Sequence, residues 1–213
     1  EKICVTGNPV RRSIAGSSLS REEGIRHFGL DPARKTILVT GGSLGAKGIN
    51  EAIAAGINQI ADAGLQLIWQ TGKSFAEQAR QLCDNNPLLQ SSAFIPQMEY
   101  AFAAADVVVS RSGAMAIAEL CIAGKAVIFV PFPYAAEDHQ TVNAGNLVNR
   151  GAALMLADAE AKDKLVNMIL DLVNDEAKQR EMRDAIGKLA LHNADVKIAQ
   201  QILDKLGIDY RVK

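Results

Sequence analysis

Short apolar runs rich in β-branched residues alternate with longer segments of helical periodicity along the first 156 residues of the chain. Several of these runs are apolar on both faces, as strands are when helices cover both sides of a sheet. Strands that alternate with helices indicate parallel β-α-β units with right-handed crossovers, so the pattern predicts an α/β domain with a doubly wound parallel sheet. The expected strands lie at residues 3–7, 36–41, 65–72, 92–95, 106–110, 126–131 and 152–156, and the expected helices at 20–28, 45–63, 74–83, 97–105, 114–123 and 138–150.

The C-terminal part of the chain, from residue 159 onward, follows a purely helical pattern. Two apolar stripes run along it at helical spacing, one formed by Leu165, Ile169, Leu172 and Val173 and the other by Ile198, Ile202, Leu203 and Leu206. We interpret the charged residues between them as a solvated face, because this part of the sequence contains no motif that suggests chemistry.

Composition narrows the class of protein. With 213 residues, 48% of them hydrophobic, the chain is long enough for one domain around a large core. The 23 basic and 24 acidic residues give a formal net charge of −1, so no overall field favours polyanions, and nucleic acid is not an expected partner. The three cysteines are widely spaced, which indicates reduced thiols and a cytoplasmic location.

The sequence lacks the usual signs of membrane insertion or export. No run reaches the roughly 18 apolar residues of a transmembrane helix, and no secretory signal opens the chain. The first six residues, EKICVT, read as a strand already under way without a starter methionine. We therefore expect residues 1–213 to be one domain of a longer protein, with a further domain upstream of it.

A glycine-rich loop follows the expected strand at 36–41. Ligands of open α/β sheets bind beyond the carboxyl ends of the strands, and glycines at such a turn let a phosphate approach the start of the next helix. The loop contains neither a Walker motif nor a complete dinucleotide fingerprint, so a tight turn without a ligand is the alternative. The candidate phosphate-loop residues here are Gly41, Gly42 and Gly45, and Ser112 and Gly113 of the next segment join them.

A second candidate segment runs from Ser110 to Glu119, again where a strand passes into a helix. The small residues Ser112 and Gly113 leave room for a ligand above the helix start, and Glu119 is placed to accept hydrogen bonds from a ribose diol. In the alternative interpretation, Ser112 caps the helix and Glu119 is a surface charge.

The loop after the strand at 126–131 delivers polar side chains to another helix start. His139 and Gln140 carry both donors and acceptors, as recognition of sugar hydroxyls requires. Asp138 capping the helix is the simpler alternative. The other histidines, His27 and His192, lie in ordinary helical stretches, so no metal site is expected.

An arginine pair follows the first expected strand. Arg11 follows the turn formed by Gly7, Asn8 and Pro9, with Val10 between them, and lies where a nucleotide or a second domain would bind. An exposed pair of arginines without a ligand explains the same sequence equally well.

Taken together, these segments resemble the C-terminal domain of the MurG family of bacterial N-acetylglucosaminyltransferases, which act in peptidoglycan synthesis. The family motifs occur in order along nearly the whole chain as GNPVR, VTGGSLGA, QTGK, FIPQM, ADVVVSRSGAMAIAE, PFPY and DHQ followed by T-x-N. The resemblance implies a GT-B enzyme built of two Rossmann-like domains. Residues 1–213 are then the donor-binding domain, and the N-terminal acceptor domain is absent from this chain.

The resemblance also assigns roles to individual residues. Arg11 and Ser43 would contact the nucleotide and its phosphates, and the backbone of Ile95 would read the uracil edge. Glu119 would bind the ribose hydroxyls. The pyrophosphate would rest on Ala114, Met115, Ala116, Ile117 and Ala118, through their backbone at positions 115 and 116, while His139 and Gln140 would hold the N-acetylglucosamine.

The implied reaction is inverting transfer of N-acetylglucosamine from UDP-N-acetylglucosamine to the C4 hydroxyl of lipid I, which gives lipid II. It needs no metal or other cofactor, and the sequence contains no Asp-x-Asp pair. The general base is expected in the missing N-terminal domain, so this chain alone should bind the donor without turnover. In the full-length protein, membrane attachment would be peripheral and on the cytoplasmic face.

Two other classes of function remain open. One is another GT-B enzyme that uses a UDP-sugar, such as a glycolipid glycosyltransferase or an epimerase. The other is a nicotinamide-dependent oxidoreductase domain, which needs an acidic residue at the end of the strand after the glycine loop. Gln70 and Thr71 stand there instead, which disfavours the oxidoreductase.

Overall fold

The computed structural model describes residues 3–208 and contains one parallel sheet of six strands in the order β3-β2-β1-β4-β5-β6. Every neighbouring pair of strands is parallel, which confirms the predicted doubly wound, Rossmann-like α/β fold. The strands are β1 (Thr36–Thr40), β2 (Gln66–Gln70), β3 (Leu89–Ser92), β4 (Val107–Ser110), β5 (Ala126–Phe129) and β6 (Leu154–Met155).

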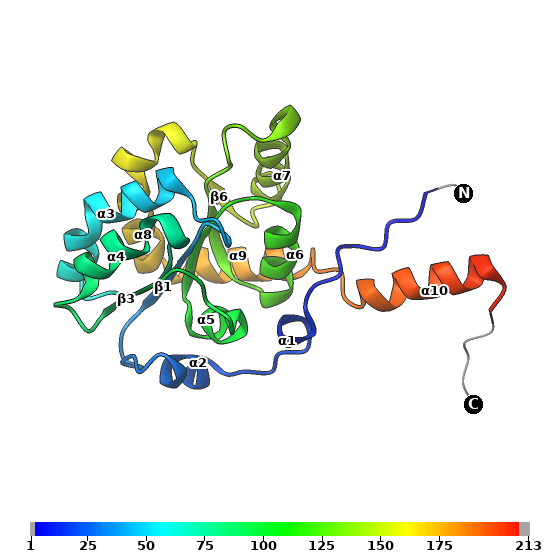
Figure 1. Cartoon of the computed structure of the whole chain (residues 1–213), viewed down its shortest axis with the longest axis horizontal. Coiled ribbons are helices and arrows are strands. Elements are labelled where there is room, and N and C mark those ends of the chain that lie inside the picture. Colours follow the sequence, from blue (N-terminus) through cyan, green and yellow to red (C-terminus); the bar gives the residue numbers. More distant parts are fainter. Residues whose placement is uncertain (1–2, 209–213) are drawn as a thin grey trace.

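Helices cover both faces of this sheet (Figure 1). Alternate residues of β1 enter two hydrophobic clusters: Ile37 and Val39 join the cluster that includes α3 and α8, while Leu38 joins the cluster that includes α5 and α6. The helices are α1 (Arg12–Ala15), α2 (Arg21–His27), α3 (Lys47–Asp62), α4 (Ala76–Cys83), α5 (Met98–Ala104), α6 (Ala114–Ala123), α7 (His139–Val148), α8 (Ala161–Asn174), α9 (Glu176–Gly187) and α10 (Ala194–Leu206), with 3-10 turns η1 (Lys73–Phe75), η2 (Ala136–Asp138) and η3 (Asp158–Glu160).

Local sequence explains where helices begin. Before α2, the Ser20 hydroxyl accepts a hydrogen bond from Glu23 N at 3.2 Å, and the Glu23 carboxylate accepts one from Ser20 N at 2.8 Å. This capping box satisfies two backbone N–H groups that the helix leaves unpaired, and it lowers the pKa of Glu23 through the bonds from Ser20.

The strand order places a crevice at the carboxyl ends of β1 and β4. The chain runs outward from β1 to β2 and β3, then returns to add β4 on the other side of β1, where Thr40 lies opposite Ser110. The loops that leave these two strands therefore diverge to opposite faces of the sheet. A ligand site is expected at such a topological switch point.

Two expected strands differ from the structure. The expected strand at 3–7 is wrong: this segment lies outside the sheet, and the side chains of Ile3 and Val5 are both 84% exposed. Its β-branched residues give strand propensity, but no neighbouring strand is available to pair with them in the described part of the chain. The strand expected at 92–95 is β3, Leu89–Ser92, so the apolar residues 93–95 lie beyond its end.

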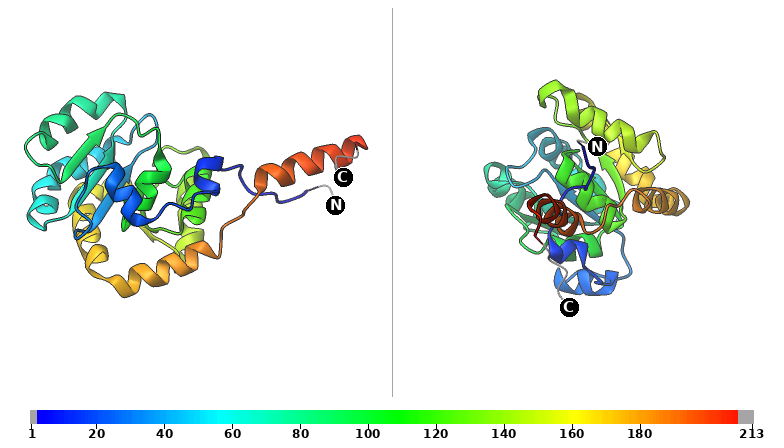
Figure 2. Two further views of the ribbon diagram at one scale, coloured as in Figure 1. Left: turned by 90° about the horizontal axis from the view of Figure 1, so that it is seen from below. Right: turned by 90° about the vertical axis from the view of Figure 1, so that its right-hand side faces the viewer.

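The helical tail is confirmed as α8, α9 and α10, but its two apolar stripes have different surroundings. The stripe on α8 is buried, whereas on α10 Ile202 is 53% exposed and Leu206 is 66% exposed. In Figures 1 and 2, α10 projects from the body of the molecule on the same side as the N-terminal segment. No helix in residues 3–208 has both the length and the apolar character to span a membrane.

Candidate functional site

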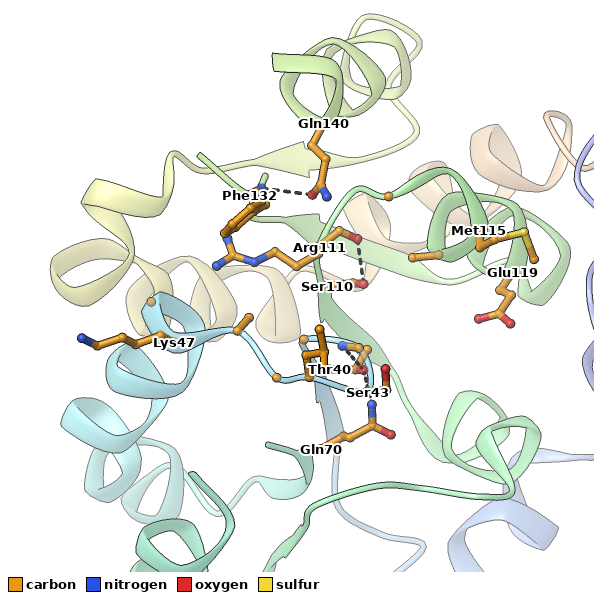
Figure 3. Close-up of a pocket in the computed structure, with 18 of the residues that line it drawn as sticks. Thr40, Ser43, Lys47, Gln70, Ser110, Arg111, Met115, Glu119, Phe132 and Gln140 are labelled. Carbon is orange, nitrogen blue, oxygen red and sulfur yellow. Dashed lines mark hydrogen bonds between the residues drawn. The ribbon is translucent and has the colours of Figure 1, made fainter. Parts of the chain in front are cut away.

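A cavity of about 1150 Å³ opens at the carboxyl edge of the sheet, at the switch point between β1 and β4 (Figure 3). The segments that line it include the glycine loop with the start of α3, the residues after β3, the start of α6, and the loop from Phe132 to Tyr134 with Gln140. The sequence predicted ligand-binding segments at these same junctions. The structure brings them together around one cavity.

The glycine loop needs glycine for two separate reasons. Gly42 and Gly45 both have φ of +79°, a left-handed conformation that side chains rarely adopt. A Cβ on Gly45 would also lie 2.1 Å from the carbonyl oxygen of Thr71, whereas one on Gly42 would meet no atom within 4 Å. Turn geometry therefore accounts for part of the glycine pattern, and Ser43 remains on the cavity lining as a candidate ligand.

The start of α6 presents free backbone donors. Gly113 is the N-cap residue and no side chain caps the helix, so the N–H groups of Ala114, Met115 and Ala116 have no partner among the hydrogen bonds of residues 3–208. Ser112 is not the cap, because its buried hydroxyl donates to the carbonyl oxygen of Gln140 at 2.8 Å. Unpaired N–H groups together with the helix dipole make this terminus a site for an anion.

Glu119 and Arg11 line the cavity and pair with each other. Arg11 Nη2 lies 3.3 Å and Nε 3.4 Å from the same carboxylate oxygen, Glu119 Oε1. The Glu119 side chain is 17% exposed and that of Arg11 is 48% exposed. These long contacts leave Oε2 of Glu119 available for a ligand hydroxyl, and Arg11 retains donors for a phosphate.

Gln140 is oriented by the loop after β5. Its Oε1 accepts a hydrogen bond from Phe132 N at 3.0 Å, so its NH₂ group is the part left to bind a ligand (Figure 3). His139 is exposed, lies outside the cavity lining, and holds its Nδ1 2.7 Å from the carbonyl oxygen of Ala136. Asp138 has φ of 52° and makes no capping hydrogen bond with its side chain, so the capping alternative is wrong.

Most of the expected site residues reach the cavity, and helix geometry explains two of the exceptions. A helix turns only one face toward a cavity, and Ile117 and Ala118 pack against the hydrophobic cluster on the other side of α6. The residues on the lining are Arg11, Gly41, Gly42, Ser43, Gly45, Ile95, Gly113, Met115, Ala116, Glu119 and Gln140, and those off it are Ser112, Ala114, Ile117, Ala118 and His139.

Sequence reasoning missed an ion pair in the cavity wall. Arg111 Nη1 lies 2.6 Å from Asp158 Oδ1 and donates to the carbonyl oxygens of Val130 and Pro131 at 3.0 and 2.9 Å. Its guanidinium carbon lies 5.6 Å from the centre of the Phe132 ring. Arg111 stands inside the motif at the end of β4, which was a usable signal, but Asp158 lies at the start of the helical tail, where nothing in the pattern marked it.

The acidic side chains on the lining are all paired with cations. Besides Glu119 with Arg11 and Asp158 with Arg111, Glu51 Oε1 lies 3.7 Å from Lys47 Nζ. Within residues 3–208, no three His, Cys, Asp or Glu side chains form a cluster suited to a metal ion. The unpaired N–H groups at the start of α6 and the NH₂ group of Gln140 suit binding of an anion and of hydroxyl groups.

Comparison with known proteins agrees with this description. Residues 36–202 match the model of the glycosyltransferase family 28 C-terminal domain. A UDP-N-acetylglucosamine--N-acetylmuramyl-(pentapeptide) pyrophosphoryl-undecaprenol N-acetylglucosamine transferase of Phocaeicola vulgatus is 44% identical over 214 residues, covering 99% of this chain and 57% of that relative. A protein of the same name from Porphyromonas gingivalis W83 is 45% identical over 205 residues, covering 95% and 54%.

The structural comparison leads to the same family. The crystal structure of Acinetobacter baumannii MurG matches with a TM-score of 0.75 at 29% sequence identity, covering 90% of this chain and 55% of that one. The chain thus spans about half the length of the curated relatives and of the solved structure.

Proposed function

The chain belongs to the glycosyltransferase family 28 C-terminal domains, and from that premise we propose that it binds UDP-N-acetylglucosamine as the donor half of an inverting glycosyltransferase. The observation that carries this proposal is the uncapped start of α6, which faces the cavity between the glycine loop and Glu119. A nucleoside diphosphate needs an anion site beside a ribose site, and these groups supply both.

In this proposal the donor lies across the switch point. The backbone of Ile95 contacts the uracil, and Glu119 accepts hydrogen bonds from the ribose hydroxyls. The diphosphate rests on the N–H groups of α6 and on the glycine loop, with Ser43 and Arg11 beside it. The NH₂ group of Gln140 donates to the N-acetylglucosamine, and His139, one residue earlier, completes that contact with its Nε2 edge.

The proposed reaction moves N-acetylglucosamine to the C4 hydroxyl of lipid I and forms lipid II. As the bond to the sugar breaks, negative charge accumulates on the UDP leaving group. Fixed N–H groups and a helix dipole aimed at that charge stabilise the transition state, and removing a single donor of this kind costs about 3 kcal/mol in other enzymes.

We assign the acceptor and the membrane contacts to the remainder of the full-length protein. This chain matches only 57% of its relative from P. vulgatus, so lipid I binding and peripheral attachment to the cytoplasmic face of the membrane are proposed for the part it does not match. Its own role is to hold and activate the donor.

Calorimetric titration tests the proposal. The chain is titrated with UDP-N-acetylglucosamine, UDP-glucose and NAD, in the presence of EDTA. We expect selective binding of UDP-N-acetylglucosamine that survives chelation, and about tenfold weaker binding by Glu119→Gln, because a hydrogen bond to a charged group contributes roughly 1.5–3 kcal/mol. The matched control is Glu22→Gln, an exposed carboxylate at the start of α2.

Each result bears on a different alternative. Tighter binding of NAD than of any UDP-sugar would support the oxidoreductase interpretation, and equal binding of all UDP-sugars would support another GT-B enzyme. Failure to bind any UDP-sugar would overturn the proposal.

A further inference from the structure

A buried hydrogen-bond chain connects two walls of the cavity. Gln70, at the end of β2, is 2% exposed, and its Oε1 accepts a hydrogen bond from Ile95 N at 2.9 Å. Its Nε2 donates to Thr40 Oγ1 at 3.2 Å, and the same Thr40 oxygen accepts a hydrogen bond from Gly42 N at 3.3 Å (Figure 3). The chain therefore runs from the segment after β3, through two strand ends, to the glycine loop.

We propose that Gln70 and Thr40 are positioning residues, which hold the base-binding segment at Ile95 and the phosphate-binding loop at Gly42 at a fixed spacing. The inference rests on the proposed function, because it assumes that one ligand spans both segments. Neither residue was among the expected ligands. Gln70 stands where a dinucleotide-binding domain needs an acid, and here its carboxamide joins two loops of the site.

The carboxamide suits this task better than other side chains of similar size. One end of it must accept from a backbone N–H and the other must donate to a hydroxyl, and a carboxamide has both groups without depending on its protonation state. Thr40, which is 8% exposed, then offers one oxygen to two donors. Loss of that oxygen would leave the buried Gln70 Nε2 and the Gly42 N–H without their protein partner, and the link that joins the two segments would be broken.

The Ile95 backbone shows what this arrangement leaves for a ligand. Its N–H is taken by Gln70, and its carbonyl oxygen has no partner among the hydrogen bonds described for residues 3–208. The base-binding segment thus presents an acceptor. The Gln70 link sets the position of that acceptor relative to the glycine loop. Loss of the link should therefore weaken binding of a ligand that contacts both the Ile95 segment and the glycine loop more than binding of a ligand that contacts only one of them.

The same two strands contain a matched control at their amino ends. Gln66 and Thr36 begin β2 and β1, are both fully buried, and face each other in register as Gln70 and Thr40 do. Gln66 Nε2 donates to Thr36 Oγ1 at 3.1 Å, and Gln66 Oε1 accepts from Asp31 N at 2.6 Å. This second pair has the same chemistry, but it lies at the amino ends of the strands, away from the cavity.

The test compares Thr40→Val with Thr36→Val, two isosteric changes that each remove one hydroxyl. Binding of UDP-N-acetylglucosamine and of uridine is measured at a temperature where thermal unfolding shows both variants to be folded. We expect Thr40→Val to weaken binding of UDP-N-acetylglucosamine about tenfold, because the buried Gln70 Nε2 loses its partner and the link to Gly42 is broken, and binding of uridine less than about twofold. Thr36→Val should lose stability but bind both ligands within about twofold of the unsubstituted chain, and Thr40→Ser, which keeps the hydroxyl, should restore binding.

The inference is overturned if Thr40→Val binds UDP-N-acetylglucosamine as tightly as the unsubstituted chain does. It is also overturned if Thr36→Val weakens binding of UDP-N-acetylglucosamine as much as Thr40→Val does, because the loss of affinity would then reflect reduced stability of the fold. Should Thr40→Val fail to fold, the pair Gln70→Met and Gln66→Met makes the same comparison from β2. Absence of binding by the unsubstituted chain is a separate result, which overturns the proposed function and this inference with it.

Discussion

At the scale of single residues, the environment of Cys121 gives a prediction that depends on pH. The thiol is buried on α6, and burial raises its pKa to about 11. In the unfolded chain a cysteine ionises near pH 8.5. Between these values only the unfolded state gains the thiolate, so ionisation favours unfolding and the contribution of Cys121 to stability falls as the pH rises.

We expect this loss of stability in the unsubstituted chain and not in a variant without the thiol. Cys121→Ala lacks the titrating group, so the gap in unfolding free energy between the unsubstituted chain and this variant should shrink by about 2 kcal/mol from pH 8 to pH 10.5. Denaturant unfolding at both pH values measures the gap. Leu120→Ala is the control, because Leu120 is equally buried on the same helix and does not titrate. A gap for Cys121→Ala that stays constant with pH would contradict the prediction.

Single residues of the site could be predicted from the sequence, but their partners could not. Arg11, Glu119 and Gln140 could be predicted because each stands in a motif at a strand end. Their partners could not be: that Arg11 pairs with Glu119 depends on a contact across 108 residues of chain. Asp158 was missed for the same reason, since its proximity to Arg111 exists only after the sheet has brought β4 and η3 together.

At the scale of elements, the turn between β1 and α3 gives the next prediction. Gly45→Ala should lower the unfolding free energy by more than 2 kcal/mol beyond the cost of Gly42→Ala, measured by denaturant unfolding. Both residues have the same positive φ, so both substitutions carry a left-handed strain of about 1–2 kcal/mol. Only at position 45 does the added Cβ also meet backbone, 2.1 Å from the Thr71 carbonyl oxygen.

Gly42→Ala is therefore the matched control for the shared strain. Equal losses of stability in the two variants would show that the loop moves to admit the Cβ and that close packing against Thr71 does not fix its shape.

Element boundaries show which part of a pattern carries structural information. β1, β4 and β5 are buried because sheet neighbours and helices enclose them on all sides. This burial requires apolar residues on both faces of each strand, and those runs made the three strands predictable from the sequence. β3 is an edge strand and its polar residues gave little signal, so the prediction moved to the apolar residues 93–95, of which Phe94 and Ile95 line the site. The run at 3–7 has strand propensity alone, and propensity without a partner strand makes no sheet.

At the scale of the whole molecule, periodicity predicts a helix but not its neighbours. The stripes on α8 and α10 look alike in the sequence, yet Leu165 is fully buried and Leu206 is 66% exposed. Burial of the α8 stripe follows from its contact with α3 across the sheet face. Nothing in the 13 residues of α10 specifies whether a partner lies against them.

The last prediction concerns what the chain does alone: it should bind UDP-N-acetylglucosamine and release no UDP when lipid I is added. Attack on the donor requires a group that takes the proton of the acceptor hydroxyl. Among the described residues, each carboxylate on the cavity lining is paired with a cation, Lys47, Arg11 or Arg111. His139 lies off the lining, and in the proposal it contacts the donor sugar and not the acceptor hydroxyl.

The measurement is UDP release with donor alone and with donor and lipid I, beside a full-length member of the family as positive control. We expect no difference between the two conditions for this chain, while calorimetry on the same sample shows donor binding. Release that depends on lipid I would contradict the prediction. Such release would mean that donor binding and proton transfer are not divided between this chain and the rest of the full-length protein. Its loss in Asp158→Asn or Glu51→Gln would then identify which paired carboxylate serves as the base.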